Sequence, residues 1–432
     1  MKRKIYKELI EWKQSKIRKP LLLLGARQVG KTYILKQFGR DEYEDMLYFN
    51  FEEDTRLCDF FDEKIDPKNI INNLSIYSGR QILPDKHLIF FDEIQLCNNA
   101  LNSLKYFNEQ SNDYHVVSAG SMLGVKRSGN KSFPVGKVDI LRLYPMNFLE
   151  FLQANGDKKL AELMENKTKI EPLPEPIHKK SIELLKYYYL TGGMPEVVKY
   201  FVETNETNQI RKIQNDILQG YEYDFTKYAS SNDAPKMSLI WKSIPHQLSK
   251  DNNKFIFSAV KKSARSRDYE NAVNWLEDNG LILISKRITK PFIPLKSYVK
   301  HNAFKVFLLD VGLLGALANI DPKIILFGDE IFTEFKGAFT ENYVAQEFRA
   351  YDLELFYWES KGKAEMDFIV EKDNKVMPIE VKASINTKSK SMSVYKNKYK
   401  PDMAVKINLL NAELKNKNAN IPLYAISLLM KL

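Results

Sequence analysis

The sequence predicts an α/β protein whose first part is a parallel β-sheet. The segment LLLLGARQVGKT, residues 21–32, runs four leucines directly into a glycine-rich loop, as a buried strand followed by a tight turn does. Over residues 1–150, short apolar runs alternate with helical stretches, which is typical of a sheet covered by helices. The pattern then changes, and we expect a helical lid at 151–230, a winged helix at 231–325 and a second α/β domain at 326–432.

The glycine-rich loop carries a complete phosphate-binding motif, Gly25-x-x-x-x-Gly30-Lys31-Thr32. Its two glycines let successive backbone N–H groups face a phosphate, and the following helix adds its N-terminal dipole. Lys31 can reach the β- and γ-phosphates, and the Thr32 hydroxyl can hold Mg²⁺. A chance turn is the alternative, but the strand before the loop and the helical spacing after it favour the motif. We expect a nucleoside triphosphate to be bound by Gly25, Ala26, Arg27, Gln28, Val29, Gly30, Lys31, Thr32 and Tyr33.

A second element of a nucleotide site follows in the strand HLIFFDE, residues 87–93. In such sites the acid at the strand tip, here Asp92, holds Mg²⁺ through water, and the next acid, Glu93, polarises the attacking water. We therefore expect Glu93 and Lys31 to be catalytic. The next strand, Tyr114–Ala119, ends near Ser121, which could sense the γ-phosphate; Ser118 is the alternative, and a plain turn explains the serine equally well.

Composition excludes several classes of protein. The chain has 432 residues, 44% of them hydrophobic and 28% charged, as in an ordinary globular protein. No apolar stretch approaches the roughly 20 residues that span a bilayer, and the basic N-terminus lacks the hydrophobic core of a signal peptide. Two cysteines argue against a disulfide framework, and the five histidines show no zinc-ligand spacing. We expect a cytoplasmic protein without a membrane partner.

Basic residues gather in two segments of a chain whose net charge is +10. From Val260 to Lys305 there are ten Lys and Arg against four acids, and from Val381 to Lys417 nine Lys against two acids. Basic surface is the electrostatic footprint of a polyanion such as DNA. A solvated lysine-rich face is the alternative, and charge alone favours it, because surface lysines are common.

The middle of the chain has two expected parts. Residues 151–230 are expected to be helical, and residues 231–325 are expected to contain helices followed by a β-hairpin. After the linker Ala229–Lys236, helices are expected at Met237–Leu248 and Tyr269–Asn279. The strand-like LILISKRI and the apolar alternation at Ser297–Leu309 follow. Helices followed by a basic β-hairpin describe a winged helix, which can bind DNA or serve as a protein–protein module.

A second set of chemically active residues lies in the last segment. The expected helix Lys336–Ala350 carries Glu341, and two expected strands carry Asp367 and the triplet Glu380-x-Lys382. Strand alternation places Glu380 and Lys382 on one face. A helix Glu, a strand Asp and a strand Glu-x-Lys in this order form a metal-dependent nuclease constellation. Asp367 and Glu380 would hold Mg²⁺, Glu341 would complete the metal shell, and Lys382 would activate water or stabilise the transition state.

These motifs together resemble bacterial and archaeal AAA-type ATPases that carry a C-terminal domain related to PD-(D/E)xK nucleases. The markers of the resemblance are RKPLLLLGARQVGKT, FFDEIQ, AGS, LYPMNFLEF, TGGMPEVV, NDILQGYEYD and the final ENY…EMDF…PIEVKAS series. The resemblance implies an AAA-like core with ATP as the nucleotide and Mg²⁺ as its metal. Such sites often borrow an arginine from a neighbouring copy, so the resemblance is compatible with a homo-oligomer, although the sequence does not give the oligomeric state.

One position departs from the family pattern. Members usually have Gly-Arg where this chain has Gly136-Lys137. If that arginine acts on the γ-phosphate, Lys137 is a weaker substitute, because a lysine lacks the bidentate fork. Arg142 or Arg127 could act instead.

Two main functions are consistent with these features. The first is an ATP-hydrolysing protein in which nucleotide gates the access of DNA, held by the winged helix, to the nuclease-like domain. The second is an ATP-dependent switch or scaffold with a catalytically inactive nuclease fold. An ATPase that remodels proteins, with merely solvated lysines, is a third.

Overall fold

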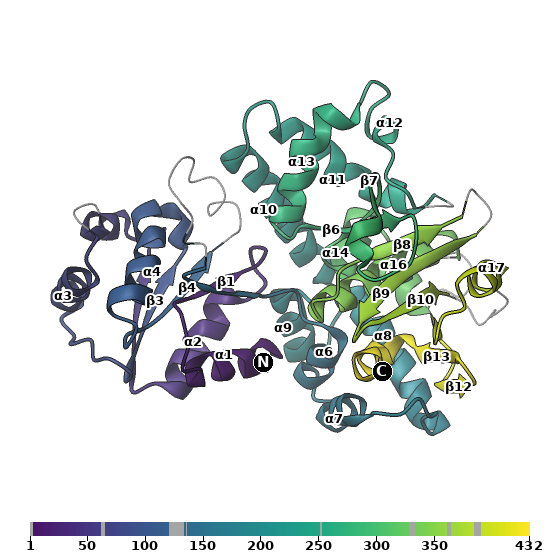
Figure 1. Ribbon diagram of the computed structural model, residues 1–432, viewed down its shortest axis with the longest axis horizontal. Helices are drawn as coiled ribbons and strands as arrows, with labels where there is room; N and C mark the ends of the chain where they lie inside the picture. Colours follow the sequence, from purple (N-terminus) through teal and green to yellow (C-terminus); the bar gives the residue numbers. More distant parts are fainter. Residues whose placement is uncertain are drawn as a thin grey trace. The chain divides into compact units, whose positions relative to one another are not determined.

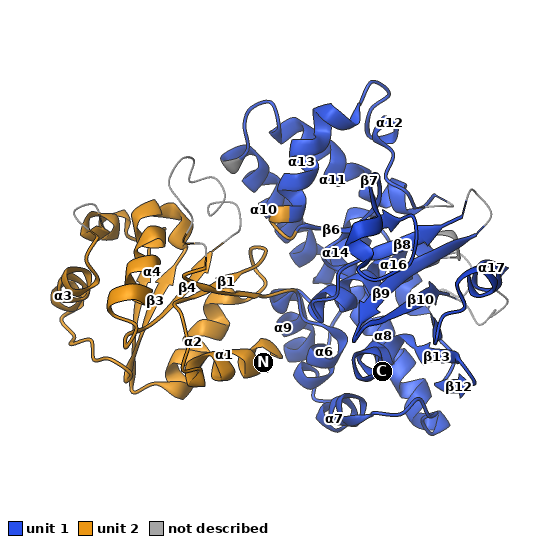
Figure 2. Cartoon of the chain, in the orientation of Figure 1, with its two compact units in different colours: residues 1, 145–277, 281–432 blue, residues 2–144, 278–280 orange. Residues whose placement is uncertain are grey.

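The computed structural model describes residues 3–61, 65–120, 134, 136–250, 253–327, 333–360, 364–383 and 390–432, without the side chains of 228 and 333–336. These residues form two compact units (Figure 2). Within the described ranges, unit 2 comprises residues 3–144 with 278–280, and unit 1 comprises residues 145–277 and 281–432. In the described part of the chain, no helix is long and apolar enough to span a bilayer.

Unit 2 contains the predicted parallel sheet (Figure 1). Its strand order is β2-β3-β4-β1-β5, and every pairing is parallel. All four leucines of β1 are buried, as the apolar run predicts for a central strand. The fold class predicted for this part is confirmed. The strands are β1 (Leu21–Leu24), β2 (Asp45–Asn50), β3 (His87–Asp92), β4 (His115–Gly120) and β5 (Asp139–Arg142).

Helices cover both faces of this sheet. The amphipathic helix α1 (Ile5–Gln14) packs on α2 (Lys31–Glu42), which packs on β2, β3 and β4. The other face carries a large apolar cluster in which η1 (Thr55–Phe61), α3 (Pro67–Ser78) and α4 (Asn98–Gln110) meet the strands. This sandwich fixes the carboxyl ends of β1 and β3, where ligands of open α/β sheets bind.

Unit 1 begins with helices that pack against its own C-terminal part. The backbone N–H of Phe148 donates to Glu347 Oε1 (2.7 Å), and that of Gly193 donates to Asp310 Oδ2 (2.6 Å). The two compact units divide at residue 144, and residues 230 and 325 both lie inside unit 1, so the four predicted domains stay a prediction. That these helices form a lid stays a prediction. They are α6 (Phe148–Ala154), α7 (Lys158–Asn166), α8 (Glu175–Thr191), α9 (Pro195–Thr204) and α10 (Ile210–Tyr228).

The second sheet of the chain is mixed, with the order β12-β13-β11-β10-β9-β8-β6-β7. Helix α16 (Thr333–Ala350) packs on β10, β6 and β7, and α17 (Lys390–Tyr399) packs on β9. The strands are β6 (Ile282–Ile288), β7 (Val299–Leu308), β8 (Phe356–Glu359), β9 (Glu365–Lys372), β10 (Lys375–Val381), β11 (Ala404–Asn408), β12 (Glu413–Lys415) and β13 (Asn418–Pro422).

The hairpin predicted as the wing of a winged helix is part of this sheet. Helices α11 (Ala234–Leu248) and α13 (Ser266–Asp278) precede it, as expected. However, β6 pairs with β8 in parallel as well as with β7 in antiparallel. The hairpin therefore continues the C-terminal sheet, so its inner strand has no free edge.

Candidate functional site

The phosphate-binding loop is fixed by close packing at both ends. A Cβ at Gly25 would overlap the carbonyl oxygen of Leu143, so only glycine fits there. Gly30 has φ = 97°, a left-handed conformation that favours glycine and that starts α2. The guanidinium of Arg3 donates to the carbonyls of Val29 (3.0 Å) and Tyr144 (2.6 Å), so a residue near the N-terminus also holds the loop.

Lys31 is folded back on its own loop. Its ammonium donates to the carbonyls of Gly25 (3.0 Å) and Ala26 (2.8 Å), and the residue is only 7% exposed. Burial lowers the pKa of Lys31 to about 8, although Glu93 and Asp92 favour its charged form. The neighbouring carboxylates thus compensate only part of the desolvation, and a phosphate placed in the loop would supply the missing negative charge.

The structure brings Thr32 and Asp92 together as the motif predicts. The Thr32 hydroxyl donates to Asp92 Oδ2 (2.8 Å). The same carboxylate oxygen accepts from the hydroxyl of Tyr48 (2.9 Å), which lies on the neighbouring strand β2. The hydroxyl and carboxylate oxygens are hard ligands that suit Mg²⁺, so these residues fit the ion that accompanies a triphosphate.

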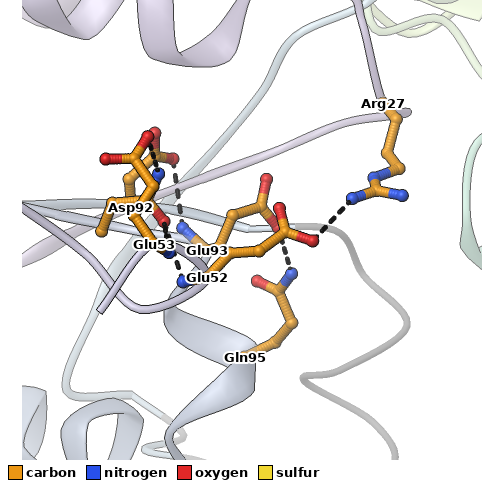
Figure 3. Close-up of polar contacts among 7 residues, drawn as sticks. Arg27, Glu52, Glu53, Asp92, Glu93 and Gln95 are labelled. Atoms are coloured by element: carbon orange, nitrogen blue, oxygen red, sulfur yellow. Dashed lines mark hydrogen bonds and ion pairs between the residues drawn. The ribbon is translucent and has the colours of Figure 1, made fainter. Parts of the chain in front are cut away.

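Glu93 lies at the tip of β3 with its side chain held by a glutamine (Figure 3). Gln95 Nε2 donates to Glu93 Oε2 at 2.5 Å. A Cβ at Gly120, the last residue of β4, would come within 2.6 Å of Gln95 Oε1, so Gln95 lies between the two strand tips. The Glu93 carboxylate therefore accepts a hydrogen bond from the Gln95 side chain, and this bond has to break before Glu93 can act on a water molecule.

Two further acidic residues, Glu52 and Glu53, follow the end of β2, next to Asp92 and Glu93 at the end of β3. Arg27 of the loop forms an ion pair with Glu52 (3.5 Å), and Asn50 donates to Glu53 (2.9 Å) (Figure 3). The tips of β2 and β3 thus carry four carboxylates beside the loop. Such an edge repels a bare triphosphate and favours one that carries its divalent ion.

The predicted sensor and arginine positions are only partly described. Ser121 and Arg127 lie outside the described residues. Ser118 is buried in β4, and its hydroxyl has no partner among the described residues. Lys137 forms an ion pair with Glu109 (2.9 Å), and Arg142 is exposed. The Lys137 ammonium is therefore engaged on the surface of its own unit.

The second predicted constellation also comes together, in unit 1. Lys382 Nζ lies 3.0 Å from Glu380 Oε1, and Asp367 Oδ2 accepts from the backbone N–H of Val381 (2.7 Å). Glu341 reaches the same region from α16, where its Oε2 lies 3.3 Å from the ammonium of Lys305. The spacing of these residues in the sequence therefore did indicate a common location.

Lys305 corrects one expectation. It is one of the ten basic residues of the first basic segment, for which a surface that binds DNA or a solvated face is expected, but its side chain is 1% exposed and its ammonium lies 2.6 Å from Glu365 Oε1. It belongs to the interior because β7 turns inward from residue 305 onward, after an exposed first half. Its position within the apolar run AFKVFLL is the only sequence signal that could have indicated burial.

The electrostatics of this interior cluster are dominated by carboxylates. Burial and then Glu341 raise the pKa of Asp367 to about 8. Burial also raises the pKa of Glu365, against the effect of Lys305. Burial lowers the pKa of Lys305, but Glu341 and Glu365 outweigh it and hold the pKa above its usual range. The lysine is therefore an ammonium among acids.

The cluster does not have the arrangement of a metal site. Among the described residues, which include all four predicted members, no group of three or more His, Cys, Asp and Glu is placed to hold a metal ion. Glu380 Oε2 is the one oxygen of the set that is buried without a partner in the described structure. In this structure the three predicted carboxylates are therefore not grouped around a common position for the Mg²⁺ that the resemblance implies.

The geometry of unit 2 defines a class of protein, the P-loop nucleotide-binding proteins with a parallel sheet. Comparison with family models agrees, since residues 17–152 match the family described as AAA domain. The match and the fold of unit 2 thus both support an AAA-type ATPase core. Residues 182–324 and 336–426 match two families described as domains of unknown function, DUF8612 and DUF4143.

Individual proteins that are similar to this chain share low sequence identity with it. An uncharacterized protein of Methanocaldococcus jannaschii is 26% identical over 207 residues, which are 47% of this chain and 40% of that protein. The chain thus matches less than half of the length of this curated relative. The Walker-type ATPase PABY2304 of Pyrococcus abyssi is 13% identical, with a TM-score of 0.45 over 73% of this chain and 95% of that one. The Aeropyrum pernix ORC1 protein, solved in complex with DNA, is 11% identical, with a TM-score of 0.29 over 73% and 90%.

Proposed function

We propose that this chain binds ATP with Mg²⁺, hydrolyses it, and uses the nucleotide state to control an action on DNA. The observation that carries the nucleotide part is the convergence of Lys31, Thr32, Asp92 and Glu93 at the carboxyl ends of β1 and β3. A Mg²⁺ ion bound there would neutralise charge on the β- and γ-phosphates.

The chain's own groups have separate tasks in this reaction. The loop N–H groups and the Lys31 ammonium would bind the phosphates, with Lys31 leaving the carbonyls of Gly25 and Ala26. Thr32 and Asp92 would hold the ion, and Tyr48 would keep the Asp92 carboxylate oriented. Glu93 would accept a proton from the attacking water after it leaves Gln95.

The proposal that the chain binds and hydrolyses ATP is tested by measuring ATP turnover and nucleotide binding in the parent protein, in Lys31→Ala and in Glu93→Gln. Lys31→Ala should lose nucleotide binding. Glu93→Gln should keep binding and lose turnover by about 100-fold or more, because only the water-activating group is changed. Full activity in Glu93→Gln would contradict the assignment of Glu93.

The proposal of DNA as the partner rests on exposed basic residues of unit 1. Lys261, Lys262, Arg265 and Arg267 are exposed before or at the start of α13, and Lys390, Lys398 and Lys400 are exposed on and after α17. Arg287 and Lys296 are engaged instead, with Glu359 (2.6 Å) and Glu354 (2.7 Å). Arg267 also lies 3.6 Å from Asp268 Oδ1, so the DNA contacts that we propose are the other exposed lysines and arginines at these two places.

The test of DNA binding is its salt dependence. The triple variant Lys261→Ala, Lys262→Ala, Arg265→Ala should weaken binding and reduce the slope of log K against log salt by about 3. The matched control is Lys158→Ala with Lys159→Ala, two exposed lysines of α7 outside both basic segments. DNA binding that is absent or insensitive to salt in the parent protein would instead favour the remodelling of a protein substrate.

A further inference from the structure

Among the described lysines of unit 1, Lys305 is the most deeply buried, and it contacts two glutamates. Its ammonium lies 2.6 Å from Glu365 Oε1, 3.3 Å from Glu341 Oε2 and 5.3 Å from the centroid of the Tyr357 ring. A buried ammonium is tolerated only where opposite charges and hydrogen bonds replace its water. The two glutamates and the ring face supply that replacement.

The carboxylates that would ligate a metal are engaged with protein groups. Glu341 pairs with Lys305, Asp367 accepts from the backbone of Val381, and Glu380 Oε1 pairs with Lys382. Metal ligation by carboxylates requires oxygens at about 2.0–2.6 Å from a common ion. An ion in contact with Glu341 would lie close to the buried Lys305 ammonium, and the two like charges would repel each other.

We propose that the Lys305 ammonium is the resident cation of this carboxylate cluster and takes the place of a divalent ion there. The C-terminal α/β part of the chain is then a metal-independent module that does not cleave DNA through Asp367, Glu380 and Lys382. The inference does not depend on ATP hydrolysis, because it concerns only unit 1. Its failure would leave the proposed ATPase function untouched.

The experiment compares metal binding and thermal stability in the full chain without nucleotide. All proteins carry Asp92→Asn, which removes the carboxylate of the two metal ligands predicted in the other unit, Thr32 and Asp92. Mn²⁺ is titrated by calorimetry, and Tm is measured in EDTA and in millimolar MnCl₂. The parent protein should bind no Mn²⁺ below about 1 mM and should show the same Tm in both conditions.

The informative variant is Lys305→Met, which removes the charge and keeps most of the volume. It should have a lower Tm in EDTA, and Mn²⁺ should raise that Tm by roughly 5 °C, because the freed carboxylates now gain from an added cation. The matched control is Lys300→Met on the exposed half of β7, which should change neither quantity. A Lys305→Met protein with unchanged Tm and no response to Mn²⁺ would overturn the proposal.

A second variant covers the case in which Lys305→Met does not fold. Lys305→Met combined with Glu365→Gln removes one charge of each sign, so it should fold, regain Tm and remain indifferent to Mn²⁺. A double variant that is as unstable as the single one would show that charge balance is not the role of Lys305.

The parent protein provides the decisive contrary outcome. Micromolar Mn²⁺ binding that is lost in Glu380→Gln would mean that the unpartnered Glu380 Oε2 helps to ligate an ion. Cleavage of linear or branched DNA with Mg²⁺ or Mn²⁺ that is lost in Asp367→Ala would overturn the proposal in the same way.

Discussion

Among single side chains, Tyr48 makes the contact with the most direct consequence for the nucleotide site. Its hydroxyl donates to Asp92 Oδ2, the oxygen that also accepts from Thr32. Once Thr32 turns to an ion, Tyr48 is the remaining side-chain donor that orients this carboxylate in the described structure. We expect Tyr48→Phe to lower kcat and the apparent Mg²⁺ affinity about 3- to 10-fold, the value of one hydrogen bond of about 1 kcal/mol.

The measurement for Tyr48 is ATP turnover as a function of Mg²⁺ at saturating ATP. Tyr223→Phe serves as the control, because Tyr223 is 74% exposed on α10. A Tyr48→Phe protein with the parent's kcat and Mg²⁺ dependence would show that the hydroxyl does not orient Asp92 during turnover.

Gly25 gives a second prediction, about backbone packing. An added Cβ would overlap the carbonyl of Leu143, a backbone atom that cannot move without disturbing the end of β5. Gly25→Ala should therefore destabilise unit 2 by about 1–3 kcal/mol and weaken ATP binding, since the loop has to shift. Urea unfolding and nucleotide titration measure the two effects. Gly337→Ala on α16 is the control, because a Cβ there meets nothing within 4 Å in the described structure, and it should be neutral or slightly stabilising.

Among the helices, the contact of α16 with the start of α6 predicts a pH dependence of stability. Glu347 accepts the N–H of Phe148, and burial raises its pKa to about 8, with a further contribution from Glu150. In the unfolded chain a glutamate titrates near 4.3. Between about pH 4.3 and 8 the folded state thus holds a proton that the unfolded state has lost, so this group lowers stability as pH rises and has no further effect above pH 8.

In Glu347→Gln, the amide oxygen can still accept the hydrogen bond from the Phe148 N–H, but the side chain no longer gains or loses a proton with pH. The difference in unfolding free energy, variant minus parent, should therefore grow from about pH 4.3 to pH 8, by at most a few kcal/mol. Urea unfolding at pH 5, 6.5 and 8 measures it. A difference that stays constant with pH would mean that Glu347 is ionised in the folded protein.

The elements also show what a sequence can and cannot reveal. The strands at the loop, at Asp92 and at Asp367 and Glu380 were predicted within a residue or two, because each is a local apolar run that contains or directly precedes a functional residue. Tyr48, Gln95 and Lys305 were missed as site residues. Arg3 and Tyr48 act through contacts with partners 26 and 44 positions away, and no local pattern encodes such contacts. The joining of β6 to β8 is likewise a long-range pairing.

Because the chain forms two compact units, bound nucleotide should raise the stability of the unit that binds it, unit 2. A ligand stabilises only the part that binds it, by RT ln(1 + [L]/Kd), or about 2.7 kcal/mol at 100 times Kd. All predicted nucleotide ligands that the structure describes lie in unit 2, and Glu347 lies in unit 1. Thermal unfolding of a two-unit protein need not be two-state. We expect two transitions, of which Mg²⁺ with a non-hydrolysable ATP analogue raises only the one belonging to unit 2.

Variants identify the transitions without cutting the chain. Lys31→Ala should abolish the nucleotide-dependent shift, whereas Glu347→Gln should move the other transition at pH 8 and leave the nucleotide shift intact. Hydrogen exchange with and without the analogue locates the same effect, with added protection expected in α2 and β3. If both transitions rise together with nucleotide and both respond to Glu347→Gln, then the units unfold as one cooperative body. Nucleotide binding in unit 2 would in that case also change the stability of unit 1. Control of an action on DNA by the nucleotide requires such an energetic coupling between the two units.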